Sequence, residues 1–215
     1  MELSQVVRRR RMVRRFDPDR PVPGDVLERI LYAAQRAPSA GFSQGWDFVV
    51  LEGPSQTQAF WAATRDVERE PDAWLRGVSA APVLVLCLSD PTAYLDRYAE
   101  PDKGWTDRDP ARWPVPYWDV DTGMAAMLML LTAVDEGLGA LFFGVPPDRH
   151  TQVRRAHGIP QDRRLVGVVA LGHERERTTS PSLRRGRRSE QEVVHRGRFG
   201  GGRGTGPGES ATEPV

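Results

Sequence analysis

Apolar side chains recur at helix or strand spacing along most of the chain. Residues 27–34 place them every three or four positions, as in an amphipathic helix, and Pro38 stops the pattern. Residues 3–7 repeat the spacing over a shorter first helix. The segments "WDFVVLE" (46–52) and "APVLVLCLS" (81–89) predict strands, and the continuous apolar character of the second predicts a strand covered on both faces.

The second half of the chain continues the mixture of helices and strands. "GPSQ" begins a helix that we expect to run through 53–67, and residues 121–137 are apolar nearly all round, which predicts a central buried helix. A strand is predicted at 140–144, a helix within 146–158 with Gly158 at its end, and a last strand over 163–174. This order predicts an α+β or three-layer arrangement around one sheet.

Two stretches show no clean period. Residues 90–120 are rich in Pro, Trp, Asp and Tyr, and a long irregular segment in a compact domain is usually functional or mobile. Residues 174–198 form an arm without helical periodicity. The composition of 199–215, rich in Gly, Ser, Thr, Pro and Glu, predicts a disordered tail.

Composition and charge narrow the class of protein. The chain has 215 residues, 39% of them hydrophobic and 27% charged, which is typical of a globular protein. A net charge of +1 gives no argument for binding to nucleic acid or to a membrane. One cysteine, Cys87, allows no disulfide within the chain, and we expect it to be buried. Because no apolar run reaches the length of a membrane span or follows the N-terminus as a signal sequence would, we expect a cytoplasmic protein.

The sequence contains no motif for several common kinds of site, namely dinucleotide-binding, phosphate-binding, hydrolytic and metal sites. The sequence contains no glycine fingerprint between a strand and a helix, no phosphate-binding P-loop and no Gly-x-Ser-x-Gly turn. Its four histidines are far apart and lack metal-ligand spacing, so we expect no metal site. Four stretches remain as candidates: the arginine cluster 10–14, the small-residue loop 37–46, the glycines of 137–144 and the basic arm 184–198. Each alone has an ordinary explanation, as a solvated basic face, a connecting loop, a helix end or a charge run.

Together and in this order, the four stretches are far more specific. They read "RRMVRRF" from Arg10, "APSAGFSQGWDFVV" from Ala37, "GLGALFFG" from Gly137 and "RGRRSEQEVVH" from Arg185. With these motifs the chain resembles the FMN-dependent nitroreductase family over roughly residues 3–199. The resemblance implies a three-layer α/β/α fold of the α+β class, with one mostly antiparallel sheet flanked by helices. It also implies a homodimer of the domain-swapped type with two FMN sites at its interface, each chain contributing one FMN-binding domain over 1–198.

The resemblance also assigns roles to particular residues. The arginine cluster would contact the phosphate, ribityl chain or pyrimidine edge of FMN, the loop would come from the partner subunit, the end of the third strand would lie beside the isoalloxazine ring, and the arm would meet the phosphate. The implied cofactor-binding residues are, in that order, Arg10, Arg11, Met12 and Arg14; Pro38, Ser39, Ala40, Phe42 and Gln44; Phe143 and Gly144; and Arg185 and Arg187.

Two of these positions depart from the family pattern. Met12 replaces a small hydroxyl residue and removes one hydrogen bond to the flavin. Phe42 stands where Asn is common, which would make the site more apolar and narrow the choice of substrate.

The implied activity is an FMN-dependent oxidoreductase. Electrons from NADH or NADPH would pass through FMN to a small nitroaromatic, quinone or related electrophilic acceptor, in ping-pong order and with no catalytic side chain required. The alternative is a non-catalytic flavin-binding storage or regulatory protein of the same fold. For residues 90–120 two interpretations remain: an aromatic surface loop that packs on its own subunit, or a substrate lid in which Trp113 and Trp118 stack on flat acceptors.

Overall fold

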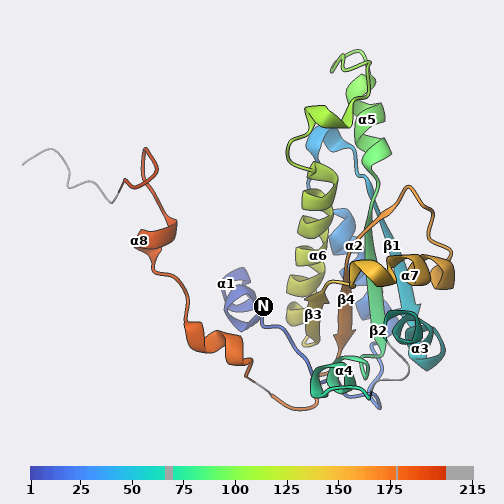
Figure 1. The fold of residues 1–215 in the computed structure, drawn as a ribbon. Helices are drawn as coiled ribbons and strands as arrows, with labels where there is room; N and C mark the ends of the chain where they lie inside the picture. The colour runs from blue at the N-terminus through green and yellow to red at the C-terminus, as the bar shows by residue number, and fades with distance from the viewer. Residues whose placement is uncertain (66–69, 178, 202–215) are drawn as a thin grey trace, which may run out of the picture. The chain divides into compact units, whose positions relative to one another are not determined.

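The described part of the chain forms a single antiparallel sheet of four strands (Figure 1). The protein is represented by a computed structural model that describes residues 1–65, 70–177 and 179–201. The strands are β1 (Trp46–Glu52), β2 (Val83–Ser89), β3 (Gly139–Phe143) and β4 (Arg164–Gly172), in the spatial order β1-β2-β4-β3. All three pairings are antiparallel, which agrees with the sheet that the family resemblance implied.

Strand β2 is buried on both faces, as its continuous apolar run predicted. Because successive side chains of a strand point to opposite faces, Val85 and Cys87 pack in one hydrophobic cluster, whereas Leu84 and Leu86 pack in the other. The sheet therefore has a hydrophobic core on each side.

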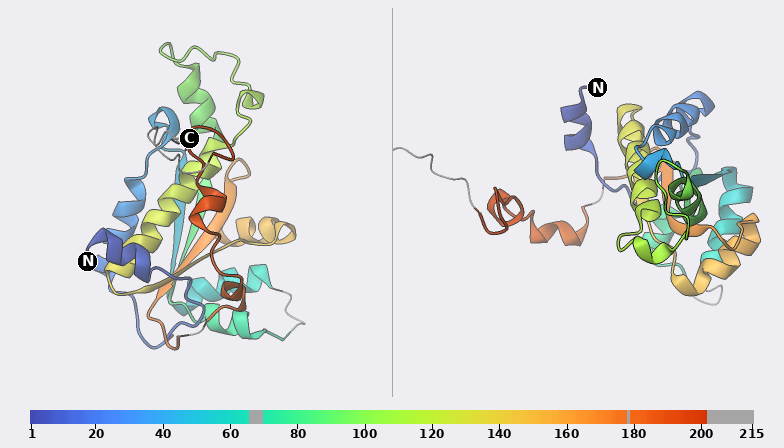
Figure 2. Two further views of the ribbon diagram at one scale, coloured as in Figure 1. Left: turned by 90° about the vertical axis from the view of Figure 1, so that its left-hand side faces the viewer. Right: turned by 90° about the horizontal axis from the view of Figure 1, so that it is seen from above.

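Helices cover both faces of the sheet and make three layers. Helices α2 (Gly24–Gln35) and α6 (Tyr117–Asp135) pack together on one face. Helices α3 (Gly53–Thr64) and α7 (His150–His157) pack together on the other, where α4 (Ala73–Val78) joins the same cluster. Figure 2 shows the two helical layers on either side of the strands. The predicted α/β/α arrangement is confirmed.

The chain divides into two compact units, Met1–Thr178 and Thr179–Val215. The first contains the sheet and its helices. Of the second, residues 179–201 are described, and they include the short helices η4 (Pro181–Arg185) and α8 (Glu190–Val193), which the sequence did not predict. None of these described residues is buried, so this arm has no hydrophobic core of its own. The predicted disordered tail falls mostly on 202–215, outside the described residues.

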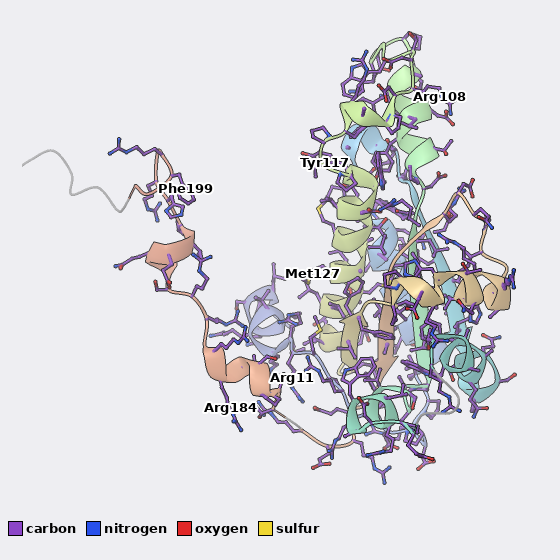
Figure 3. The ribbon with its side chains drawn as sticks, viewed as in Figure 1. Arg11, Arg108, Tyr117, Met127, Arg184 and Phe199 are labelled. Atoms are coloured by element: carbon purple, nitrogen blue, oxygen red, sulfur yellow. The ribbon has the colours of Figure 1, made fainter. Side chains whose placement is uncertain are left out.

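Helix α6 differs from its prediction in two respects. It begins at Tyr117, four residues earlier than expected, and it is not buried all round. Tyr117, Val120, Met124 and Met127 are 37–45% exposed and repeat at intervals of three or four residues, so they form one stripe along the helix. Figure 3 labels Tyr117 and Met127 on the side of α6 that faces away from the sheet. We call these four residues the α6 stripe.

The stretch 90–120 is more regular than its sequence indicated. Helix α5 (Pro91–Ala99) begins directly after Asp90, whose carboxylate accepts a hydrogen bond from the Thr92 N–H at 2.9 Å. A short turn of helix, η2 (Pro110–Arg112), follows. Aromatic and proline residues hide the helical period of α5. The Asp90-Pro91 pair is typical of the start of a helix, and it could have predicted this one.

Other helix boundaries also differ from expectation. The first helix, α1 (Leu3–Arg9), ends before the arginine-rich motif, and α3 ends at Thr64, with residues 66–69 outside the described residues. Helix α4 was not predicted at all. It is only six residues long, and its cap is Asp72, which accepts from the Leu75 N–H at 2.7 Å.

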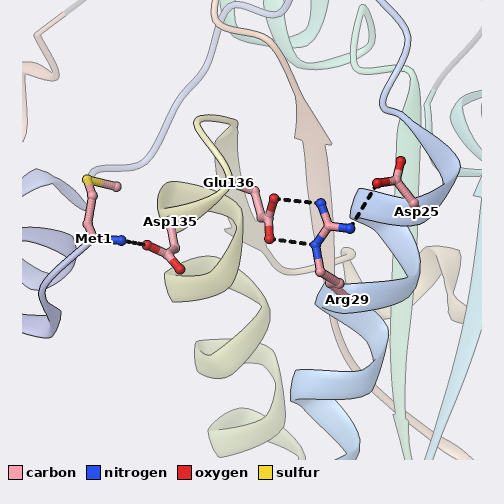
Figure 4. A network of polar contacts seen from close by, with 5 residues as sticks. All are labelled: Met1, Asp25, Arg29, Asp135 and Glu136. Carbon is pink, nitrogen blue, oxygen red and sulfur yellow. Dashed lines mark hydrogen bonds and ion pairs between the residues drawn. The ribbon is translucent and has the colours of Figure 1, made fainter.

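An ion-pair network joins α2 to the end of α6 (Figure 4). The Arg29 guanidinium donates to both carboxylate oxygens of Glu136, at 2.7 and 2.9 Å, and to Asp25 at 2.9 Å. Beside it, the amino group of Met1 pairs with Asp135. The hydrogen bonds from Arg29 lower the pKa of both Asp25 and Glu136.

We predict that replacing Arg29 with Met weakens the dependence of stability on acid pH. A carboxylate whose pKa is lower in the folded state stabilises the fold above its ordinary pKa, near 4, and loses that contribution as the pH falls. The Arg29→Met protein should therefore have a lower Tm than wild type at pH 7, and the gap should close toward about pH 3.5. Thermal unfolding followed by circular dichroism at several pH values measures this, and a gap that stays constant would contradict the role of the network.

Candidate active site

A cavity of about 480 Å³ lies beyond the end of β3. Its walls are the end of α3, the first turn of α4 and residues 143–146. The volume falls in the range of pockets that hold small molecules and cofactors. Phe143 and Gly144, two of the predicted cofactor-binding residues, line it.

Aromatic rings form one wall of the cavity. The rings of Trp61 and Phe143 stack at a centroid distance of 5.6 Å and an angle of 11°, and Trp74 meets Phe143 edge-on at 5.7 Å. Gly144 is exposed, and a Cβ added there would have no atom within 4 Å, so the backbone is open to a ligand. A flat apolar wall beside an open backbone fits a planar ring system that also needs hydrogen bonds at its edge.

The arginine-rich segment 10–16 lies along the outer edge of β3. The Val13 N–H donates to the Ala140 carbonyl at 2.9 Å, and the Phe16 N–H donates to the Gly77 carbonyl of α4 at 3.2 Å. Gly139 permits this approach, because a Cβ there would meet the Val13 side chain at 2.9 Å. Pairing with the segment covers an edge of the sheet. It also places the predicted residues Arg10, Arg11, Met12 and Arg14 on one short stretch of chain.

Arg11 and Arg14 already have partners within the chain. The Arg11 guanidinium forms a two-pronged ion pair with Glu174, and burial, followed by repulsion from Arg177, lowers the pKa of Arg11. Arg14 donates to the Met12 carbonyl at 3.1 Å. The ion pair fixes the segment to the end of β4, so Arg11 has a structural role, and its contact with FMN stays a prediction. Sequence reasoning missed Glu174, because it is one acid among many charges in the arm.

The loop 38–45 has a backbone that few residues adopt. Its short helix η1 (Ala40–Phe42) contains Gly41 at φ +61°, and Phe42 and Gln44 have φ of 56° and 49°. Two residues other than glycine in the left-handed region cost roughly 1 kcal/mol or more each. Phe42 is 74% exposed at the tip of the loop. Its neighbours must therefore supply the interactions that hold the loop in this shape.

Hydrogen bonds from three directions hold the loop. The Gln44 N–H donates to the Ser39 hydroxyl at 2.9 Å within the loop. The Ala40 N–H donates to the carboxylate of Asp121 on α6 at 2.8 Å, and the Arg97 side chain of α5 donates to the Gly41 carbonyl at 2.9 Å. The predicted residues of this loop are thus brought together and fixed by helices that the sequence did not connect with them.

The loop and the arginine-rich segment lie at opposite ends of the sheet. The loop leads into Trp46, which pairs with Ser89, and Ser89 pairs with Arg164 at the start of β4. Arg11 is bound instead to Glu174, just beyond the other end of β4. The nine residues of β4 span about 25–30 Å. Within one chain, the structure therefore does not bring these two groups of predicted residues together.

Trp113 and Trp118 belong to an aromatic cluster built from α5, α6 and the segment between them. Trp113 meets Tyr98 edge-on at 4.6 Å and lies 6.0 Å from Trp118, which in turn lies 6.1 Å from Tyr94. Trp118 is only 7% exposed. These contacts are those of a loop that packs on its own subunit, and a lid function for the two tryptophans stays a prediction.

The remaining predicted residues are in the arm. Arg185 and Arg187 are both exposed there, and their predicted contact with the FMN phosphate stays a prediction. Pro38 is exposed on its loop.

The cavity also contains residues that sequence reasoning missed. They come from the end of α3 and the start of α4: Trp61, Arg65, Asp72 and Trp74. Both tryptophans stand out as large aromatic residues, but only the folded chain shows that they meet Phe143. In residues 1–65, 70–177 and 179–201, no cluster of three metal-ligating side chains occurs and no helix is long and apolar enough to cross a membrane.

Comparison with known proteins agrees with the fold and the motifs. A model of the nitroreductase family matches residues 7–173, so this chain belongs to the nitroreductase family. It is 32% identical to an NADH dehydrogenase of Thermus thermophilus, over 78% of this chain and 84% of that protein. It is 28% identical to a putative NADH dehydrogenase/NAD(P)H nitroreductase of Methanothermobacter thermautotrophicus, over 82% of this chain and 79% of that protein.

Solved structures show the same fold at lower identity. A nitroreductase-like protein from Streptococcus mutans superposes with a TM-score of 0.70 at 19% identity, covering 89% of this chain and 96% of its own. A putative nitroreductase from Exiguobacterium sibiricum, solved in complex with FMN, superposes with a TM-score of 0.66 at 18% identity. That match covers 88% of this chain and 98% of the other.

We predict that the ion pair between Arg11 and Glu174 stabilises the domain, whereas the nearby pair between Arg15 and Glu176 does not. Glu174→Gln should lower the free energy of unfolding by roughly 1 kcal/mol, because it weakens a pair of charged hydrogen bonds that is partly shielded from water. Glu176→Gln is the control. Glu176 pairs with Arg15 from the same two segments but is 62% exposed, so the change should be within about 0.5 kcal/mol. Urea unfolding at pH 7 measures both, and equal losses would contradict the assignment.

Proposed function

We propose that this protein is an FMN-dependent oxidoreductase that uses NADH or NADPH to reduce a nitroaromatic, quinone or similar electrophilic acceptor. The observation that carries the proposal is the cavity beyond β3, with its aromatic wall and the open backbone at Gly144. Membership of the nitroreductase family supports it. So do relatives named NADH dehydrogenase or NAD(P)H nitroreductase, and the FMN complex of a protein of the same fold.

The residues of the cavity suit a bound flavin. Trp61 and Phe143 offer flat apolar contact, and the backbone after β3 offers N–H groups. Segment 10–16, which is bonded to α4 through Phe16 and Gly77, offers arginines whose positive charge suits a phosphate. A bound FMN would supply the redox chemistry of this site, namely hydride transfer from NAD(P)H and electron transfer to the acceptor, in ping-pong order. The protein binds and orients the ring and keeps water from its apolar wall. No catalytic side chain is needed in this scheme.

We also propose that the site is completed by a second copy of the chain. Loop 38–45 and segment 10–16 are about 25–30 Å apart at opposite ends of one sheet, so both can reach one flavin only if two subunits contribute. The α6 stripe offers an apolar surface for the contact. The exposed arm, which has no core in its described residues, offers a segment to exchange between subunits.

We predict that the protein purifies with bound FMN and that NADH or NADPH reduces it. In anaerobic stopped-flow mixing, the oxidised flavin band should bleach within seconds, because an active oxidoreductase must accept electrons from the nucleotide. A band that stays oxidised for minutes with both nucleotides but bleaches with dithionite would instead indicate a flavin storage or regulatory protein. Purified protein with no flavin band, and no FMN binding on titration, would contradict both.

We predict that one charge in the α6 stripe dissociates the dimer. Met127→Glu should shift the mass in light scattering from two chains to one at micromolar concentration. The reason is that an unpaired carboxylate buried in the apolar interface of a stable dimer costs free energy of association. Gln152→Glu, which adds the same charge to an exposed position on α7, should leave the mass unchanged. Wild-type protein that already has the mass of one chain, 24.0 kDa, would rule out the dimer.

A further inference from the structure

A buried carboxylate connects α6, α5 and the strained loop. Asp121 is 1% exposed, and its Oδ2 atom accepts two hydrogen bonds, from the Ala40 N–H at 2.8 Å and from the Tyr94 hydroxyl at 2.7 Å. Burial, and then the hydrogen bond to Asp121, raise the pKa of Tyr94, so its hydroxyl stays protonated as a donor. A buried charge is retained in a fold when it is well hydrogen-bonded, and here one of its two donors is the backbone of the loop.

Helix α5 supports the same loop from a second side. Arg97 donates to the Gly41 carbonyl, while Asp102 and Glu100 hold its other nitrogens. The ring of Tyr98 lies where a side chain at Gly41 would be, 2.7 Å from such a Cβ.

One turn earlier on α5, Tyr94 packs its ring against a second glycine of the loop, Gly45. Its ring would be 2.5 Å from a Cβ at Gly45. The loop therefore rests on two aromatic rings, with a carboxylate and a guanidinium bonded to its backbone.

We propose that Asp121, assisted by Arg97, is a positioning residue that presets loop 39–44 for the flavin. The segment 90–118 then serves as the support of that loop, and its aromatic cluster makes the support rigid. This inference rests on the proposed function, in which the loop contacts the FMN held by the partner subunit. Asp121 itself touches no ligand: it is buried and acts through the Ala40 N–H.

The alternative is that Asp121 only anchors α6 in the fold. A control on the same helix separates the two, because Asp119 is partly buried, with 24% of its side chain exposed. Asp119 accepts from the Ser89 hydroxyl at 2.6 Å and from Arg164, not from the loop. Asp119→Ala therefore removes a comparable carboxylate without touching residues 39–44.

Hydrogen exchange of the flavin-free protein tests the positioning directly. In Asp121→Ala, amides of the peptide 38–46 should exchange about tenfold faster than in wild type, since the Ala40 N–H loses a charged acceptor. Asp119→Ala should leave this peptide unchanged. Asp121→Asn should restore slow exchange, because one carboxamide oxygen can accept both hydrogen bonds. Equal exchange in wild type and Asp121→Ala, or equal acceleration in both alanine variants, would overturn the proposal.

FMN titration tests the consequence for the site. Asp121→Ala should raise the Kd for FMN about tenfold and shift the visible flavin band toward that of free FMN, with Asp119→Ala within about twofold of wild type. Unchanged affinity and spectrum in Asp121→Ala would overturn the flavin role. If wild-type protein fails to bind FMN, the proposed function is wrong, and hydrogen exchange alone then decides whether Asp121 sets the loop.

A second variant guards against misfolding of Asp121→Ala. Arg97→Met removes the bond to the Gly41 carbonyl from a side chain that is 25% exposed, and it should accelerate exchange of the same peptide. Its control is Asp102→Asn, which weakens the ion pair of Arg97 but leaves the bond to Gly41. Acceleration in the control alone, or in neither variant, would overturn the role of Arg97.

Discussion

The rigidity of the sheet determines how this protein can build a site. Strand β4 is buried along most of its length and paired on both sides, so its two ends stay about 25–30 Å apart. One end carries loop 38–45, and the other carries the arginine-rich segment held by Glu174. A flavin site that uses both must span two chains. In the proposed dimer, the exposed stripe on α6 and the described residues of the arm, 179–201, which have no core of their own, would contribute to the contact between subunits.

The two halves of the proposed site, the cavity beyond β3 and loop 38–45, are held in shape by different interactions. The cavity half is built on the sheet and on the aromatic packing of Trp61 with Phe143, so hydrophobic burial defines it. The loop half rests on the rings of Tyr98 and Tyr94 at its two glycines, Gly41 and Gly45, while its own large apolar side chain, Phe42, is exposed. Its unfavourable backbone is offset by hydrogen bonds to Asp121 and Arg97. Charged anchors of this kind fix the direction and register of the loop, which its proposed contact with a second subunit would need.

The sequence predicted the strands and the class of fold well, because β2 and β4 are long apolar runs whose burial is their own signal. It failed at α5, where prolines and aromatic residues hide a helix that Asp90 begins, and at α4, which is too short to show a period. The motif resemblance singled out Phe143 and Gly144, which line the cavity, and their contact with FMN stays a prediction. It could not identify Asp121 or Glu174, because their partners are distant in sequence and only the fold brings them together.

Mixed dimers test the shared site most directly. Gly144→Val adds a branched side chain in the open space beside the cavity, where we propose that FMN lies, and Gly41→Val distorts the loop, where φ is +61° and the ring of Tyr98 leaves no room. Neither homodimer should bind FMN. A purified dimer with one chain of each kind should bind one FMN per two chains, because one site then combines the intact cavity of one chain with the intact loop of the other. A mixed dimer that binds no FMN, while wild type binds two, would show that each site belongs to a single chain and would contradict the account.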